Sequence, residues 1–180
     1  MNASDHRGAT LVSIARTAIA SRPEAPPPRW TEPWLNEPAA TFVTLHLDGE
    51  LRGCIGSIEA VRHLGDDVHS NARAAAFRDP RFPPVGPEEL IALEVEVSVL
   101  SSSSPVAAAS EGDALAALRP GIDGVVLEFD GRRVTFLPQV WEGIPDPLAF
   151  LSQLRIKADL PARFWHPALR LSRYTVEKYR

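Results

Sequence analysis

One short segment brings together a nucleophile, a cation and two glycines. Residues 50–57 read ELRGCIGS and contain Cys54, the single cysteine of the 180-residue chain, two positions after Arg52. Residues two apart in an extended strand point to the same face, so Arg52 could hold its guanidinium beside the sulfur or beside an anion. A nearby cation favours the thiolate, the nucleophilic form of cysteine. The segment therefore suggests acyl or phosphoryl chemistry on a small metabolite, with Cys54 and Arg52 as catalytic residues.

The same segment also fits a protein without catalysis. Unpaired cysteine is among the most buried residue types, and Cys54 could simply fill a core position. Gly53 and Gly56 remove side chains from the strand, so another backbone or a ligand can come close. A module that binds a peptide, a metabolite or a partner protein is therefore the alternative, and the sequence leaves enzymatic activity undecided.

A catalytic cysteine usually needs a histidine base. His69 lies in the predicted helix that follows the segment and could project toward the strand, although a helix histidine without a catalytic role is the simpler interpretation. His46 is closer along the chain, but the register predicted below puts it on the opposite face from Cys54. No triad can be assembled from the sequence.

The segment DPRF supplies further candidates for a ligand site. Pro80 and Pro83 stiffen the backbone around Arg81, which could pair with Asp79 or with a small anionic ligand. The ligand-binding residues predicted from these two segments are Gly53, Gly56, Asp79 and Arg81. The chain has no Cys-x-x-Cys and no histidine pair four apart, so we predict no metal site, and no cofactor is expected.

Periodicity places these residues on a mixture of helices and strands. Apolar residues recur at helical spacing in some segments and alternate in others, and two Asp-Gly pairs are typical of tight hairpin turns. Hairpins mixed with helices in no regular order predict an α+β fold, with a mostly antiparallel sheet flanked by helices. The expected helices are 9–21, 64–78, 111–118 and 147–157, and the expected strands are 41–47, 50–56, 93–99, the two arms of 124–137, and 170–179.

The Asp48-Gly49 turn also predicts a register. If the turn has two residues, Arg52 lies opposite Leu45 and Cys54 lies opposite Val43. The second turn, at 130–131, predicts a hairpin in which the opposed pairs are Glu128 with Arg133 and Val125 with Phe136. Strand 93–99 alternates strictly, which is typical of a strand with one exposed face.

Composition limits the class of protein. The formal net charge is −4 and no run of basic residues stands out, so nucleic acid is not an expected partner. No apolar stretch reaches the roughly 20 residues that cross a bilayer, so no membrane association is expected. A single cysteine fits a cytoplasmic protein. Residues 23–38 hold six prolines and two tryptophans, which predicts an extended segment within a single domain of residues 1–180.

Several segments in order resemble the AMMECR-one domain family, known in bacteria as protein A of the AmmeMemoRadiSam system. They are LRGCIG (51–56), NARAAAFRDPRFPPV (71–85), LEVEVSVL (93–100), GIDGVVLEF (121–129), TFLPQVW (135–141) and SRYTVEKY (172–179). The resemblance implies an α+β fold with two unequal lobes and a functional site at the RGCIG strand, near a cleft between the lobes. It also adds Ile55 and Phe82 to the candidate ligand-binding residues. It also implies Memo-like and radical-SAM proteins as partners. Asp159 stands where the family often has a glycine at the end of a helix, which puts any role of this helix end in doubt.

Overall fold

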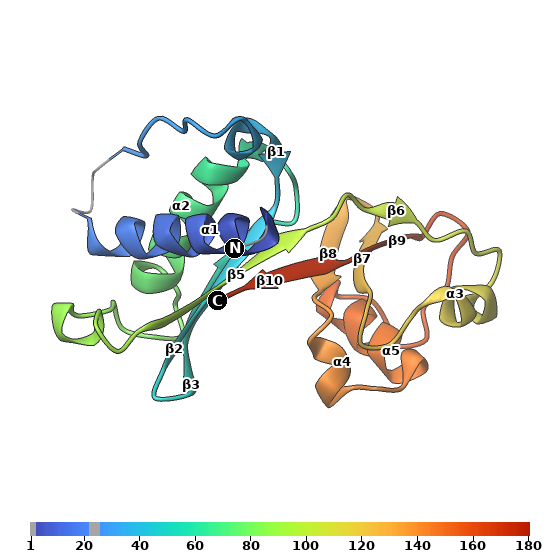
Figure 1. Cartoon of the computed structure of the whole chain (residues 1–180). Coiled ribbons are helices and arrows are strands. Elements are labelled where there is room, and N and C mark those ends of the chain that lie inside the picture. Colours follow the sequence, from blue (N-terminus) through green and yellow to red (C-terminus); the bar gives the residue numbers. More distant parts are fainter. Residues whose placement is uncertain (1–2, 22–25) are drawn as a thin grey trace. The chain divides into compact units, whose positions relative to one another are not determined.

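The computed structural model describes residues 3–21 and 26–180. The chain forms two compact units: the first contains Met1–Leu100 and Glu177–Arg180, and the second contains Ser101–Val176. Each unit combines helices with a four-stranded sheet, as the α+β prediction requires (Figure 1). None of the helices in the described ranges is long and apolar enough to cross a membrane.

The sheet of the first unit has the strand order β10-β5-β2-β3. The pairs β2/β3 and β2/β5 are antiparallel. Helix α2 packs on β2 and β3, and helix α1 packs on α2 and β5, so one face of the sheet lies under helices (Figure 1). The bounds are α1 Ala3–Ala20, α2 Leu64–Phe77, β2 Thr41–Leu47, β3 Glu50–Gly56, β5 Glu94–Leu100 and β10 Val176–Tyr179.

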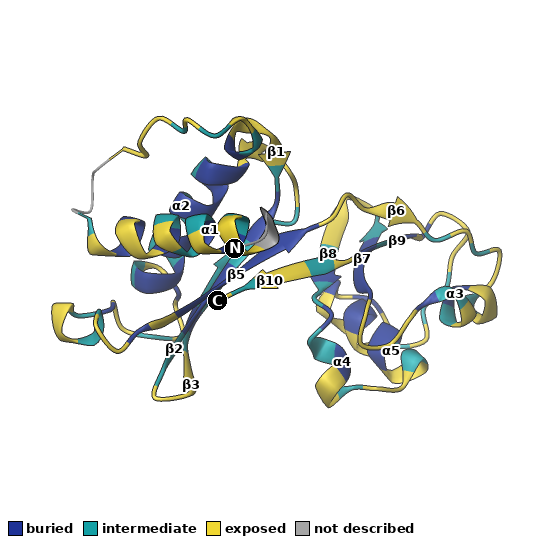
Figure 2. Ribbon diagram, in the orientation of Figure 1, coloured by how far each residue is buried: buried dark blue, intermediate teal, exposed yellow. Residues whose placement is uncertain are grey.

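The core of the first unit lies between this helix-covered face and the two helices. Val43, Leu45 and Val97 point into it from the strands and are fully buried, together with Leu11 of α1 and Val68 of α2. Burial of the core is visible as dark blue along α2 and β5, whereas the tip of the β2/β3 hairpin is exposed (Figure 2). The alternate apolar residues of the strands and the helically spaced apolar residues of α2 therefore pack into one apolar layer.

The proline-rich segment is described from residue 26 onward, and residues 23–25 of the prediction lie outside the described residues. Trp30 and Trp34 pack on the core of the first unit. Trp30 Nε1 also donates a hydrogen bond of 2.8 Å to Asp66. The short elements of this unit are the 3-10 helices η1 Pro33–Asn36 and η2 Pro87–Glu89, and a two-stranded pair of β1 Pro38–Ala39 with β4 Arg62–His63.

The first hairpin turn forms as predicted, but the predicted register beyond it is wrong. Asp48 and Gly49 have φ values of 53° and 81°, which a two-residue turn of this type needs. After the two regular pairs, Leu47 with Glu50 and His46 with Leu51, the register shifts between Leu45 and His46, and Arg52 is left without a partner on β2. This β-bulge puts Cys54 opposite Thr44 instead of Val43. A one-residue shift turns every later side chain of β3 to the other face.

Strand β5 is also more buried than the alternation predicts. Glu94 is exposed, but Glu96 and Ser98 are buried even though they lie on the face away from the helices. The strand is central in the sheet, with β10 on one side and β2 on the other. The carboxylate of Glu96 forms ion pairs with Arg180 at 2.6 Å and Lys178 at 3.8 Å, which offset the cost of its burial.

The second unit has a sheet of order β6-β9-β7-β8 and a core of its own. Its hairpin has the predicted register, with Glu128 opposite Arg133 and Val125 opposite Phe136. The predicted strand 170–179 is divided at Thr175 into β9 and β10, which belong to different sheets. The bounds are β6 Ser104–Pro105, α3 Glu111–Ala117, β7 Gly124–Phe129, β8 Arg132–Phe136, α4 Val140–Gly143, α5 Pro147–Lys157 and β9 Arg170–Tyr174.

Candidate functional site

Cys54 lies on β3, an edge strand, and points away from the helices. The neighbouring Gly53 faces α2, because a Cβ at this position would meet the carbonyl oxygen of Ala75. Cys54 therefore faces the other way, where its Sγ lies 3.3 Å from the Oγ1 of Thr44. The cysteine is partly exposed and has no disulfide partner. The sulfur is thus outside the apolar core.

The face that carries Cys54 is polar. Thr44 lies opposite Cys54 on one side and Glu96 on the other, and His46 lies opposite Glu94. Because alternate residues share a face, His46 is on the same face as Thr44 and Cys54, and our prediction that it lies on the opposite face is wrong. We call this surface the polar face and define it by the residues Thr44, His46, Cys54, Glu94, Glu96 and Arg180.

Arg52 does not hold its guanidinium against the sulfur. Its Nε and Nη2 donate to the two oxygens of Glu89 at 2.7 and 3.0 Å, and Nη1 donates to the carbonyl of Pro83 at 2.8 Å. The hydrogen bonds with Glu89 raise the pKa of the Arg52 guanidinium and lower the pKa of the Glu89 carboxyl. This bidentate pair fastens the loop 83–89 to β3, so the guanidinium is already occupied.

Asp79 and Arg81 form a second attachment, which we call the edge clamp. The backbone N–H of Cys54 donates to Asp79 Oδ2 at 2.9 Å, and the Nη2 of Arg81 donates to the carbonyl of Cys54 at 3.1 Å. Asp79 is buried and pairs with Arg81 Nη2 at 2.7 Å. The Arg81 guanidinium, helped by the N–H groups of Cys54 and Arg81, holds the pKa of the Asp79 carboxyl well below its usual range.

The edge clamp has a clear structural effect. An edge strand leaves backbone groups without ladder partners, and here the side chains of two residues satisfy both groups of Cys54. Phe82 completes the turn, since its N–H donates to the carbonyl of Asp79 at 3.2 Å and its ring lies 5.4 Å from the Arg81 guanidinium carbon. The Cys54 N–H is consequently engaged with a carboxylate.

The remaining residues of the motif are explained by packing. Because Gly53 has no side chain, the backbone of α2 at Ala75 can approach β3 closely. A Cβ on Gly56 would meet the ring of Phe42, which covers this position. Ile55 lies opposite Val43 and packs on the core. The close approach predicted for both glycines is thus supplied by parts of the protein itself.

His69 lies on the flank of α2 that faces α1. It lines a cavity of about 290 Å³ together with Ala18 and Trp30, and it is buried. Burial lowers the pKa of its imidazole, and Arg73 acts in the same direction. His69 therefore does not reach the polar face, and the structure does not bring it together with Cys54.

A buried network beside the motif was missed by the sequence analysis. Asp67 is fully buried and accepts hydrogen bonds from Thr41 Oγ1 at 2.7 Å and Ser57 Oγ at 2.6 Å. Arg62 Nη2 and Asn71 Nδ2 also contact the carboxylate of Asp67, at 2.8 and 2.9 Å. The spacing of Asp67 and Asn71, four apart on a helix, is a signal that could have indicated the network. It ties α2 to the start of β2 and the end of β3.

No metal centre is found at the site. Within residues 3–21 and 26–180, no group of three or more His, Cys, Asp or Glu side chains has an arrangement that could hold a metal ion. The motif residues that lie close together are Arg52, Cys54, Asp79 and Arg81, and they serve mainly to fix the edge of the sheet.

The sequence and the fold have counterparts in other proteins. A protein of Methanothermobacter thermautotrophicus is 40% identical over 176 residues, covering 94% of this chain and 92% of its own. A protein of Thermotoga maritima is 40% identical over 144 residues, covering 79% and 78%. The crystal structure of an uncharacterized protein from Pyrococcus horikoshii has a TM-score of 0.86 and 33% identity, covering 97% of this chain and 91% of its own. Residues 12–179 match the AMMECR1 family, written AMMECR-one above, and the chain belongs to this family.

Proposed function

We propose that this AMMECR1 protein is a binding module whose contact surface is the polar face around Cys54, Thr44 and His46. The observation that carries the proposal is that the groups expected to activate the thiol are engaged elsewhere. The guanidinium of Arg52 is held by Glu89, and the N–H of Cys54 is held by Asp79. A thiolate or an anion at this position would therefore find neither donor free.

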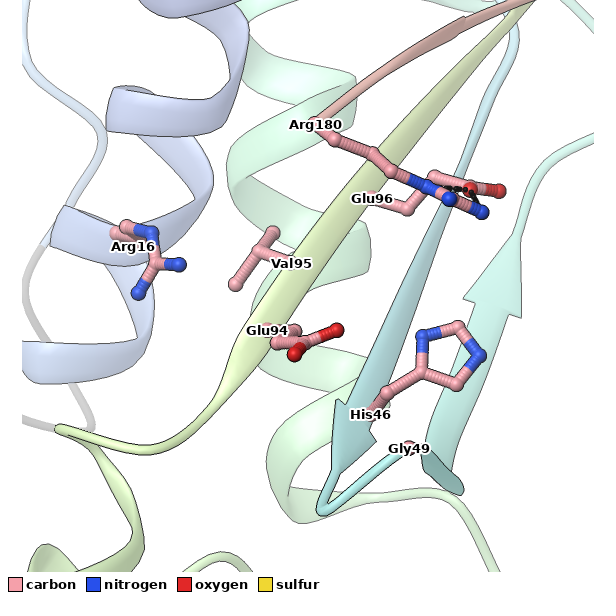
Figure 3. Close-up of a pocket in the computed structure, with 7 residues that line it drawn as sticks. All are labelled: Arg16, His46, Gly49, Glu94, Val95, Glu96 and Arg180. Carbon is pink, nitrogen blue, oxygen red and sulfur yellow. Dashed lines mark hydrogen bonds and ion pairs between the residues drawn. The ribbon is translucent and has the colours of Figure 1, made fainter.

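The polar face has groups that suit recognition. Thr44 and Cys54 form a hydrogen-bonded pair. In the part of the chain that the structure describes, the side chains of His46 and Glu94 have no hydrogen bond or ion pair (Figure 3). The side chains of His46 and Glu94 are at least partly exposed and lie on a rigid sheet, so they can bind a ligand without first being released from internal partners. By family association, Memo-like and radical-SAM proteins belong to the proposal as binding partners.

A cysteine-dependent enzyme component is the second candidate, and one observation favours it. His46 and Cys54 share a face, in nearly diagonal positions on neighbouring strands, which puts their Cα atoms about 7–8 Å apart. A substrate lying between them could contact both groups. In this case Cys54 would be the nucleophile and His46 the base, replacing the His69 of the sequence prediction.

Alkylation of the single thiol distinguishes the two candidates. The rate with iodoacetamide at neutral pH would be measured for the folded protein and for the urea-unfolded chain. The binding module predicts that the folded protein reacts more slowly, because Cys54 is partly covered and bonded to Thr44. A folded rate at least about tenfold above the unfolded rate, which falls in the His46→Ala variant, would instead establish the enzyme.

Binding of the proposed partner proteins is tested with this protein immobilised. A Memo-like and a radical-SAM protein would be passed over the wild type and over Thr44→Lys, which places a bulky cation on the polar face. Retention by the wild type and loss with Thr44→Lys supports the proposal. Equal retention by both would locate binding elsewhere, and a matched Thr10→Lys variant on α1 controls for the added charge.

A further inference from the structure

A cavity of about 290 Å³ lies between helices α1 and α2, which pack against each other (Figure 1). Its wall is mostly apolar: Ile14 and Ala18 come from α1, and Trp30 comes from the proline-rich segment. Pro26 and Pro28 form an outer wall and are themselves exposed, so the cavity opens to solvent beside them. The cavity shares no lining residue with the polar face and is a separate site.

His69 is the polar side chain that this cavity leaves without a partner. It lines the cavity from α2 and is only 8% exposed. The imidazole also borders a wider polar hollow of about 560 Å³. Within residues 3–21 and 26–180, neither ring nitrogen has a hydrogen bond or an ion pair on either side. A buried polar group without a partner is costly, so a bound molecule that pairs with the imidazole would remove this cost.

The other polar groups beside the apolar wall are already engaged. Trp30 Nε1 donates to Asp66 at 2.8 Å, and the Oγ of Ser21 donates to the carbonyl of Ala18 at 2.9 Å. The two prolines have no N–H and offer no backbone donor. A buried water molecule needs two to four polar partners, which this part of the cavity does not supply. The cavity therefore suits an apolar molecule with one polar group better than it suits water.

The lining also indicates the charge of the ligand. The described residues that line the cavity include no Asp, Glu, Lys or Arg, so a charged ligand would lose its hydration without gaining a counter-ion. Burial lowers the pKa of the His69 imidazole, and Arg73 adds to this while Asp66 opposes it. A neutral imidazole has one donor and one acceptor, and because both nitrogens are unpaired either tautomer can form. The ligand is therefore uncharged.

Size and shape complete the description. An engineered cavity of about 150 Å³ holds benzene, so a cavity of about 290 Å³ has room for two fused rings. The ring of Trp30 lies against Gly65, where a Cβ would meet it, and its N–H is bonded to Asp66. Trp30 is thus held in place before a ligand enters, and an aromatic ring packs well on it.

We propose that the cavity binds a small uncharged aromatic molecule of two fused rings, whose N–H or O–H group donates a hydrogen bond to His69. The apolar walls take up the rings, and the imidazole selects for the polar group. The inference goes beyond the proposed function, because it assigns a second site on the helix-covered side of the sheet that uses neither Cys54 nor His46.

Two probes of the same shape test the proposal by NMR titration of the full chain. Indole has the N–H donor, and benzothiophene has a sulfur atom in its place. We expect indole to shift the indole N–H of Trp30 and the amides of Ala18 and His69, with a Kd on the order of 0.1–1 mM. In His69→Leu the ratio of the indole affinity to the benzothiophene affinity should fall about fivefold, because only indole loses a hydrogen bond. Negatively charged indole-3-carboxylate should bind the wild type at least about tenfold more weakly than indole.

Two tryptophan variants on α1 check the position of the site. Thr17 is exposed and lines the cavity, so Thr17→Trp should fill it and abolish indole binding. Ala9→Trp, at an exposed position of the same helix outside the lining, should bind indole as the wild type does. Thr44→Lys on the polar face should also leave indole binding unchanged, so failure of this site and failure of the polar face are distinguishable.

Four results would overturn the proposal. They are indole leaving the signals of Trp30 and His69 unmoved, an unchanged affinity ratio in His69→Leu, wild-type indole binding by Thr17→Trp, and indole-3-carboxylate binding as tightly as indole.

Discussion

At the scale of single residues, the RGCIG motif is explained chiefly by what its members hold in place. Arg52 binds the loop 83–89, and Gly53 allows α2 to pack closely on β3. The backbone of Cys54 is held by the edge clamp of Asp79 and Arg81. Only the thiol and its neighbour Thr44 remain directed at the polar face. A motif of this kind therefore combines a rigid frame with one partly exposed functional group.

Asp79 is expected to make the stability of the protein sensitive to acid. Its pKa is lower in the folded protein than in the unfolded chain, so its stabilisation is present above the ordinary carboxyl pKa and is lost as the pH falls. Asp79→Asn should lower the free energy of unfolding by about 2 kcal/mol at neutral pH and flatten its decline below about pH 4. Urea unfolding across pH measures this, with Glu142→Gln as the control. If the free energy of unfolding of Asp79→Asn falls with decreasing pH as steeply as that of the wild type, Asp79 contributes nothing to the acid sensitivity.

Gly53 is expected to tolerate no side chain. A Cβ there would meet the Ala75 carbonyl, which is backbone and cannot rotate away. Gly53→Ala should destabilise the protein by about 1–3 kcal/mol through displacement of α2. Gly143→Ala is the matched control, since nothing lies within 4 Å of its Cβ position and alanine favours a helix. Thermal unfolding compares the two, and equal melting temperatures would contradict the close contact.

At the scale of elements, the β-bulge at Arg52 decides which groups can meet. It reverses the face on which Cys54 lies relative to a regular hairpin, and so turns the thiol from the apolar core to the polar face. The same bulge brings His46 and Cys54 onto one face. The extra residue, Arg52, is released from the ladder and is free to reach Glu89.

The register can be tested by cross-linking. Thr44→Cys should form a disulfide with Cys54 on mild oxidation, because directly opposed residues on neighbouring strands have Cα atoms about 4.5–5.5 Å apart. Val43→Cys should keep both thiols, since its side chain points into the core. Counting free thiols before and after oxidation distinguishes the variants. A disulfide in Val43→Cys and none in Thr44→Cys would restore the regular register.

At the scale of the whole molecule, the chain builds two separate cores. The second unit, Ser101–Val176, is continuous in sequence, whereas the first needs Glu177–Arg180 to complete its sheet. In the second unit the ring of Trp141 stacks on Phe150 with centroids 3.7 Å apart, and the Trp141 Nε1 donates to the Asp123 carbonyl at 2.7 Å. Each unit therefore has the contacts of an independent folding unit.

The fragment Ser101–Val176 is expected to fold by itself. It should unfold cooperatively and give a near-ultraviolet circular dichroism signal from the buried Trp141, because its core is complete without the first unit. Phe150→Ala should lower the free energy of unfolding of the same fragment by about 3–5 kcal/mol, which is most of its stability. A fragment without a cooperative transition would mean that the second unit depends on the first.

The sequence by itself determined most of the longer helices and strands, both Asp-Gly turns and the register of the second hairpin. These features depend on local rules: positive φ at Asp-Gly, alternation in strands and helical spacing. Because the resemblance rests on segments that occur in order along the chain, it also indicated the family. The candidate motif was recognisable for the same reason.

Only the tertiary structure decided what the motif residues do. A bulge leaves little trace in local sequence, because it depends on the pairing of two strands and on the loop that receives Arg52. The partners of Arg52 and Cys54 lie 25 to 37 positions further along the chain, at Asp79 and Glu89. Long-range hydrogen bonds of this kind are fixed by packing, so a local pattern could not reveal that the proposed anion-binding groups are already engaged.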